Sequence, residues 1–253
     1  MLARRTNWMG VATVALALWS APAAAYRPFD GTDAAVAKPG EVEIELGPAG
    51  VLRQGSQTTL VAPATVINIG LAKDWEAVFE GRGQFPLSSS DDRASLTDVA
   101  AFLKGVLRPG SLQDRTGPSI ATEFGVLLPG INAQPGFGAS LAGIVSQRWE
   151  WGTVHLNLAT ALTRDQHADL FVGAIVEGPI KWPVRPVVEV FYENEIGESR
   201  TVSALGGAIW QVKDDLSFDV GLRRALTNGQ PVNEVRAGLT FAFPANFLGA
   251  KSR

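Results

Sequence analysis

The sequence predicts an all-β protein, folded as a closed antiparallel transmembrane β-barrel of about twelve strands after a cleaved signal peptide. Three features indicate this fold: an export signal at residues 1–25, strand-length segments of alternating apolar and polar residues, and connections that differ in length between the two rims. We expect residues 26–40 to form a periplasmic N-terminal segment, residues 41–243 the barrel, and residues 244–253 a C-terminal tail.

The composition excludes several classes of function. The chain has 253 residues, no cysteine and a formal net charge of -3. Without cysteine there are no disulfides, thiol nucleophiles or thiolate metal ligands, which suits a chain that crosses the oxidising periplasm unfolded. The mild acidity provides no basic stripe that could neutralise phosphates, so we expect no nucleic-acid partner.

The first 25 residues predict a secretory signal peptide. Arg4 and Arg5 precede the apolar stretch 9–19, and small residues lie before the expected cleavage after Ala25. The alternative is an uncleaved anchor, which is disfavoured because the stretch is shorter than the ~20 residues that a membrane-spanning helix needs. We therefore expect export to the bacterial outer membrane.

Period-two alternation predicts the strands. In 41–46 glutamates alternate with Val42, Ile44 and Leu46, and similar alternation recurs along the chain. Two prolines, Pro63 and Pro179, fall inside strand spans, where the missing N–H disfavours pairing. The predicted strands are 41-52, 57-71, 75-86, 97-107, 118-128, 136-149, 152-164, 168-181, 185-195, 201-212, 215-226 and 233-243.

The connections alternate in length. Short turns at 72–74, 150–152, 182–184 and 213–214 are typical of the periplasmic rim, and the mostly longer loops between them of the outer rim. An even number of strands brings both ends of the barrel to the periplasmic side. The connection 108–117 departs from this pattern, being long where a short turn is expected, and we interpret it as a structured periplasmic loop.

Tryptophans add a second constraint on the orientation. Five of them fall near the short-turn ends, as expected of an aromatic girdle at the periplasmic interface. The alternative is that they cap the core of a soluble sandwich. These residues are Trp75, Trp149, Trp151, Trp182 and Trp210.

Backbone hydrogen bonding explains why the sheet should close. In hydrocarbon an unpaired N–H or C=O costs several kcal/mol, so a sheet that faces lipid must have no free edge. About twelve strands enclose more space than side chains alone fill, whereas eight enclose a nearly solid interior. We expect a monomer whose partners are outer-membrane lipid and, during biogenesis, the barrel assembly machinery.

Several segments resemble a known family. The segments 102–119, 123–129, 193–198, 207–223 and 236–243 are similar to the outer-membrane proteins associated with meta-pathway phenol degradation. This resemblance implies a barrel that moves small hydrophobic compounds. One departure concerns the end of the chain: such barrels usually end on an aromatic residue, whereas residues 244–253 follow Phe243 here. Either 238–243 serves as an internal assembly signal, or the tail through Phe247 takes part.

The inward face of the strands carries the candidate site. Charges there either line a pore or form a salt-bridge network that holds the wall rigid, and we favour the network. His155 could act as a general base, as in outer-membrane phospholipases, but an interior hydrogen bond is the simpler interpretation. The predicted lumen-lining residues are Glu43, Glu80, Arg82, Lys104, Glu123, Arg148, His155, Glu189, Glu193, Asp219, Arg223 and Arg236.

These patterns predict a channel or transporter for small molecules, and the resemblance extends this expectation to hydrophobic ones. No phosphate-binding loop, metal-ligand cluster or nucleophile elbow is present in the sequence, so we expect no catalytic residue, cofactor or metal. Asp91, Asp92, Asp214 and Asp215 lack the oxygen-rich repeat of a calcium site. The alternatives are a barrel-embedded lipid-modifying enzyme, a structural barrel without transport, and a periplasmic β-sandwich that binds ligands.

Overall fold

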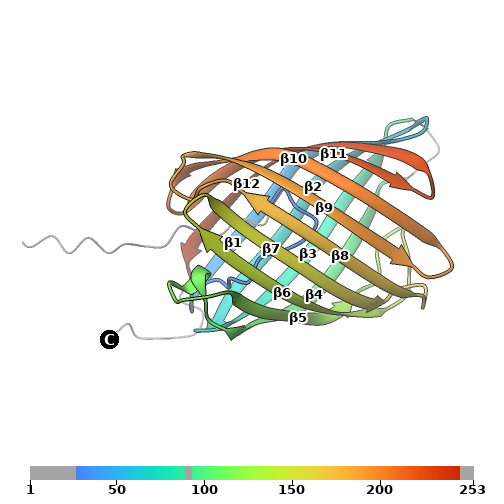
Figure 1. Ribbon diagram of the computed structural model, residues 1–253. Helices are drawn as coiled ribbons and strands as arrows, with labels where there is room; N and C mark the ends of the chain where they lie inside the picture. Colours follow the sequence, from blue (N-terminus) through green and yellow to red (C-terminus); the bar gives the residue numbers. More distant parts are fainter. Residues whose placement is uncertain (1–26, 89–92, 246–253) are drawn as a thin grey trace, which may run out of the picture.

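The computed structural model describes residues 27–88 and 93–245, and these form twelve strands in a closed antiparallel barrel (Figure 1). The predicted signal peptide, Asp91, Asp92 and residues 246–253 lie outside the described residues. The strands are β1 (Glu41–Gln54), β2 (Gln57–Ala72), β3 (Trp75–Pro86), β4 (Ser95–Arg108), β5 (Ser119–Leu127), β6 (Gly138–Trp149), β7 (Gly152–Leu162), β8 (Ala168–Glu177), β9 (Val184–Glu195), β10 (Ser199–Lys213), β11 (Leu216–Thr227) and β12 (Gln230–Pro244).

The predicted fold class is confirmed. Every strand pairs with its neighbours in the chain, and β1 pairs with β12, where Val42 lies opposite Phe243. This last pairing removes both free edges, as a wall in hydrocarbon requires. β1 begins and β12 ends at the same rim, on the left in Figure 1.

The two prolines act as local interruptions. The register of β2 against β3 shifts between Val61 and Ala64, so Pro63 lies at a bulge where no ladder N–H is needed. β8 ends at Glu177, four residues before its predicted end, because Pro179 cannot continue the ladder. The Pro179 carbonyl instead accepts a hydrogen bond from the N–H of Trp182, which closes a turn.

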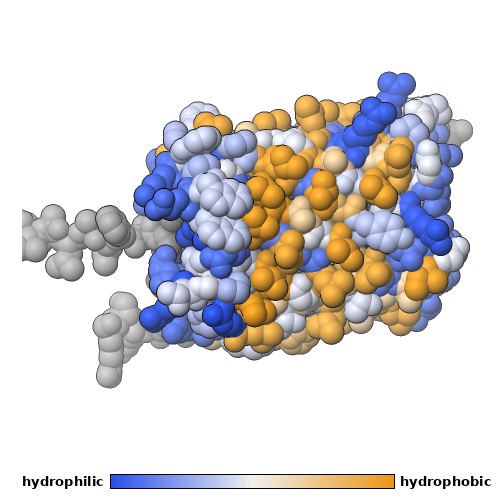
Figure 2. All heavy atoms as spheres, in the orientation of Figure 1, coloured by the Kyte–Doolittle hydropathy of each residue, from blue (hydrophilic) through white to orange (hydrophobic). Residues whose placement is uncertain are grey.

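The outer face of the barrel is apolar. Side chains that alternate along the strands are exposed, among them Leu158 on β7, Val202 on β10 and Leu222 on β11. Figure 2 shows the resulting belt of hydrophobic residues between two more polar rims. All five tryptophans of the predicted girdle are exposed, and Trp149 stacks on Trp151 with ring centroids 5.3 Å apart. The apolar face therefore points outward, and not into a dry two-layer core.

The inner face is polar. Along β7, His155 and Asn157 are buried, whereas their neighbours Leu156 and Leu158 are exposed. The same alternation places Glu234 and Arg236 of β12 inside the barrel. Among the described residues, no helix is long and apolar enough to cross a membrane.

The long connection between β4 and β5 has a structural role. It contains a short 3-10 helix, η1 (Ser111–Gln113), at the rim where β1 begins. Leu112 packs against a small apolar cluster of Ala34, Ala121 and Ile144 inside the wall. Gln113 Nε2 donates a hydrogen bond of 2.9 Å to the carbonyl of Ala34. The loop is long because it folds back under the barrel and holds part of the chain inside it.

Candidate functional site

Residues 27–37 lie inside the barrel, and not in the periplasm as expected for residues 26–40 (Figure 1). Lys38 and Pro39 are exposed next to the start of β1. We call residues 27–37 the inner segment. Its backbone N–H groups have no strand partner, so they must bond to something else when buried. Polar side chains of the barrel wall accept them: Gly31 N bonds to Glu189 Oε1 at 2.7 Å, and Ala34 N to Ser146 Oγ at 2.9 Å. The inward polar residues thus replace water for a chain without secondary structure.

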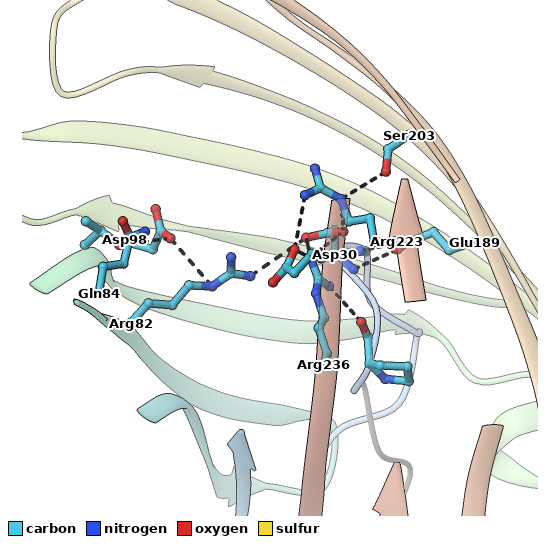
Figure 3. A network of polar contacts seen from close by, with 12 residues as sticks. Asp30, Arg82, Gln84, Asp98, Glu189, Ser203, Arg223 and Arg236 are labelled. Atoms are coloured by element: carbon cyan, nitrogen blue, oxygen red, sulfur yellow. Dashed lines mark hydrogen bonds and ion pairs between the residues drawn. The ribbon is translucent and has the colours of Figure 1, made fainter. Parts of the chain in front are cut away.

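Asp30 is the centre of an ionic cluster (Figure 3). Its Oδ1 lies 2.9 Å from Arg236 Nη2, its Oδ2 lies 3.4 Å from Arg223 Nε, and Arg82 Nη2 is 3.8 Å from Oδ1. Glu234 accepts hydrogen bonds from both Arg223 and Arg236. Burial alone would raise the pKa of Asp30, but the three arginines lower it to about 2. Asp30 therefore stays ionised and tethers the inner segment to three strands.

Arg27 occupies space that small residues leave open. Its Nε lies 3.5 Å from Asp219 Oδ2, and its N–H donates to Glu45 Oε2 at 3.1 Å. A side chain at Gly47 or Gly238 would collide with the Arg27 guanidinium. These two inward glycines therefore belong to the binding site of the inner segment.

Asp33 anchors the second half of the inner segment. Lys104 Nζ, which is fully buried, lies 3.5 Å from both Asp33 Oδ1 and Glu76 Oε1. Glu76 also accepts a 2.6 Å hydrogen bond from the N–H of Ala37. Burial raises the pKa of Asp33 to about 6, against the opposing charge of His155. This carboxyl group is therefore the part of the inner segment that titrates closest to neutral pH.

A serine, a histidine and a glutamate lie in a row on β6, β7 and β8. Ser146 Oγ is 2.8 Å from His155 Nδ1, and His155 Nε2 is 3.3 Å from Glu177 Oε1. Arg185 Nε lies 3.5 Å from Glu177 Oε2. The row resembles a hydrolase triad in residue type, but Ser146 is fully buried and already accepts the N–H of Ala34. As it stands, the row supports the inner segment.

The inner segment separates two cavities. The first has a volume of about 360 Å³, and the second, nearer the rim where β1 begins, has about 350 Å³. Residues of the inner segment line both, as does Glu76. The interior is thus hollow on both sides of the inner segment.

All twelve predicted lumen residues lie on the inner face. Their part in solute passage stays a prediction. The first cavity is lined by Glu80, Arg82, Lys104, Glu123 and Glu193, and the second by Glu43 and Arg148. The others contact the inner segment or its supports: His155, Glu189, Asp219, Arg223 and Arg236.

Other interior residues are missing from the predicted set. Glu76 and Glu234 lie on the same strand faces as Glu80 and Arg236, so the alternation itself could have identified them. Asp30 and its neighbours lie in a segment without periodicity, and no pattern marks them. Among the described residues, no three histidines or carboxylates lie close enough to hold a metal ion.

A closed twelve-strand wall with an apolar exterior and a polar, hollow interior defines the class of outer-membrane β-barrels. The sequence matches no family profile and no curated protein. Among solved structures, the COG4313 outer membrane channel from Pseudomonas putida F1 is 12% identical over 85% of this chain and 100% of that chain, with a TM-score of 0.59. The NanC porin is 7% identical over 79% and 98%, with a TM-score of 0.55. The KdgM porin in complex with disordered oligogalacturonate is 11% identical over 79% and 99%, with a TM-score of 0.51. These solved neighbours are outer-membrane channel barrels, and they share the fold of this chain.

Proposed function

We propose that the protein is an outer-membrane channel through which small molecules pass without chemical change. The observation that carries this proposal is the pair of interior cavities on either side of the inner segment. A structural barrel without transport needs no such space. A solute enters from the outer rim, passes the constriction at residues 30–33 and leaves through the cavity next to η1.

The lining of the first cavity suggests which solutes pass. Among the described residues, its carboxylates outnumber its basic side chains, so with these carboxylates ionised the cavity favours cations over anions. Phe29, Val78 and Phe171 add apolar surface to the same lining. Its carboxylates are Asp30, Glu45, Glu76, Glu80, Asp98, Glu123, Asp169 and Glu193, and its bases are Arg27, Arg82 and Lys104.

A mixed lining of this kind suits small amphipathic solutes. An aromatic ring can lie against the phenylalanines while its polar group bonds to a charged side chain. We therefore extend the proposal to small aromatic compounds, in keeping with the resemblance to barrels associated with phenol degradation. The proposed location is the outer membrane, reached after cleavage of residues 1–25, and the proposed working unit is a monomer.

Electrical recording tests the channel. Purified mature protein is inserted into a planar lipid bilayer with a tenfold KCl gradient across it. We expect discrete conductance steps and a reversal potential of the sign that K⁺ selectivity gives. Liposome swelling with phenol-sized solutes then measures passage of uncharged molecules. A protein that inserts but gives neither current nor swelling contradicts the proposal.

The row of Ser146, His155 and Glu177 favours one second candidate, a lipid hydrolase. For this activity the inner segment must first leave Ser146, because Ala34 N occupies its hydroxyl oxygen. Hydrolysis of a short-chain ester by the wild type, abolished in His155→Gln, supports that candidate. The absence of any hydrolysis leaves the channel as the function of the barrel.

A further inference from the structure

Two arginines interrupt the apolar outer face of the barrel. Arg53 of β1 and Arg224 of β11 both lie opposite Asn233 of β12, so the three side chains form one row across adjacent strands. Directly opposed residues share a face, and their second neighbours Val51 and Leu222 are exposed on the outer wall. The row therefore points toward lipid.

The row lies close to the outer rim, opposite the rim where β1 begins and β12 ends. Arg53 is the penultimate residue of β1, and Arg224 lies three residues before the end of β11. In the described residues, neither arginine takes part in an ion pair, and Arg53 makes only a weak 3.4 Å hydrogen bond to the carbonyl of Gly55. Among the residues that the structure describes, no carboxylate neutralises either charge. Long basic side chains near a membrane surface need an anionic or aqueous partner.

Apolar grooves flank Arg224 on both sides. One groove, of about 360 Å³, lies between the two arginines and is lined by Val51, Leu222 and Val235. The other, of about 890 Å³, extends over β6 to β11 and is lined by outward apolar side chains such as Leu158 and Val202. Arg224 lines both grooves. A cationic side chain next to two apolar grooves matches an amphiphile with an anionic headgroup and several acyl chains.

We propose that this row is a binding site for a phosphorylated glycolipid of the outer leaflet. Arg53 and Arg224 are two strands apart, a separation of ~10 Å, which lets both guanidinium groups reach the phosphates of one headgroup. The amide of Asn233 donates a hydrogen bond between them. Acyl chains occupy the grooves on either side of Arg224. The inference rests on the proposed outer-membrane location, because only there does this rim meet the outer leaflet.

Native mass spectrometry in detergent tests the site with lipid A as the probe. The variants are Arg53→Gln, Arg224→Gln and the double variant, and Lys213→Gln serves as the matched control because Lys213 is an exposed base at the opposite rim. We expect the double variant to retain at least tenfold less lipid A than the wild type, each single variant about threefold less, and the control the wild-type amount. Dephosphorylated lipid A should bind the wild type as weakly as lipid A binds the double variant.

Two outcomes overturn the proposal: equal retention of lipid A by the wild type and the double variant, or equal binding of the phosphorylated and dephosphorylated lipids. A heat-induced gel shift in the same samples shows that each variant is a folded barrel. Conductance is measured in parallel, and we expect it to be unchanged in the double variant because the row lies outside the lumen. Absent conductance with intact lipid binding therefore contradicts the channel alone, and the reverse result contradicts the lipid site alone.

Discussion

Asp30 Oδ1 lies 2.9 Å from Arg236 Nη2, although 206 residues separate the two in the chain. Arg236 Nη1 also donates a 2.8 Å hydrogen bond to the carbonyl of Pro28. The last strand of the barrel thereby holds the start of the described chain in the middle of the lumen. In the proposed channel, we therefore expect passage to depend on the strength of this contact.

Replacing Asp30 by asparagine should release the inner segment. The substitution removes the charge that Arg82, Arg223 and Arg236 surround and leaves three lumen cations without it. The lowered pKa of Asp30 corresponds to on the order of 2 kcal/mol of docking free energy, or roughly a 30-fold shift in the docking equilibrium. Single-channel recording should show a larger mean conductance. Asp165→Asn, in an outer loop, is the control, and equal conductance in wild type and Asp30→Asn speaks against the constriction.

Docking of the inner segment should depend on pH in two opposite phases. Because burial raises the pKa of Asp33 to about 6, the docked state binds a proton more tightly, and docking strengthens as pH falls from about 6 to 4. Because the pKa of Asp30 is about 2, docking weakens again as pH falls from about 4 to 2. We expect minimum conductance near pH 4–5.

The Asp33→Asn variant separates the titration of Asp33 from that of the charged residues around it. Asp33 is faced by Lys104 from β4, Arg148 from β6, His155 from β7 and Glu177 from β8. The variant should lose the change between pH 6 and 4 and keep the change below pH 4. A pH 6 to 4 phase that persists in Asp33→Asn assigns the titration to those neighbours and refutes its assignment to Asp33.

Removing the Ser146 hydroxyl should loosen the inner segment while the backbone pairing of β6 with β7 stays intact. Ser146→Ala leaves the buried N–H of Ala34 without its acceptor and His155 Nδ1 without its partner, at a cost of about 1–3 kcal/mol. Limited proteolysis should cleave within residues 27–37 faster than in the wild type. Ser140→Ala, on the same strand but at the wall of the first cavity, is the matched control. Identical cleavage rates in Ser146→Ala and wild type count against a supporting role for the row.

Neutralising the first cavity should reduce its preference for cations. Glu80→Gln combined with Glu123→Gln removes two carboxylates of its lining without changing side-chain size. In a KCl gradient at pH 9 or above, where the carboxylates of the wild type are ionised, the reversal potential should move toward zero. Single-channel conductance in symmetric salt should change by less than about twofold. The control is Glu150→Gln, in the exposed turn between β6 and β7. A reversal potential unaffected by the double substitution locates the selectivity elsewhere.

Alternation in the sequence predicts the barrel well for a physical reason. Each strand has lipid on one side and a polar interior on the other, so consecutive residues, such as His155 and Leu156, must alternate between polar and apolar. The two-residue turn between β6 and β7 also determines which residues pair across these strands. Ser146 opposite His155 follows directly from that turn, so this contact could have been predicted and was missed.

The position of the inner segment could not be predicted in the same way. Residues 27–40 have no period, and nothing local distinguishes a periplasmic tail from a chain that enters the lumen. Its place depends on side chains far away in the sequence, such as Glu189 and Arg236, that meet only when the barrel closes. The unexpected length of the 108–117 connection was the one indication in the sequence, because Gln113 in this connection donates a hydrogen bond to the carbonyl of Ala34.

The central claim is that the apolar residues face lipid on a wall without free edges. Gel electrophoresis of the membrane fraction, with and without boiling, tests it most directly. We predict that the protein is recovered with the outer membrane and that the unboiled sample migrates differently from the boiled one, because the closed barrel resists detergent until it is heated. Recovery in the soluble periplasmic extract with identical migration of both samples would contradict the claim.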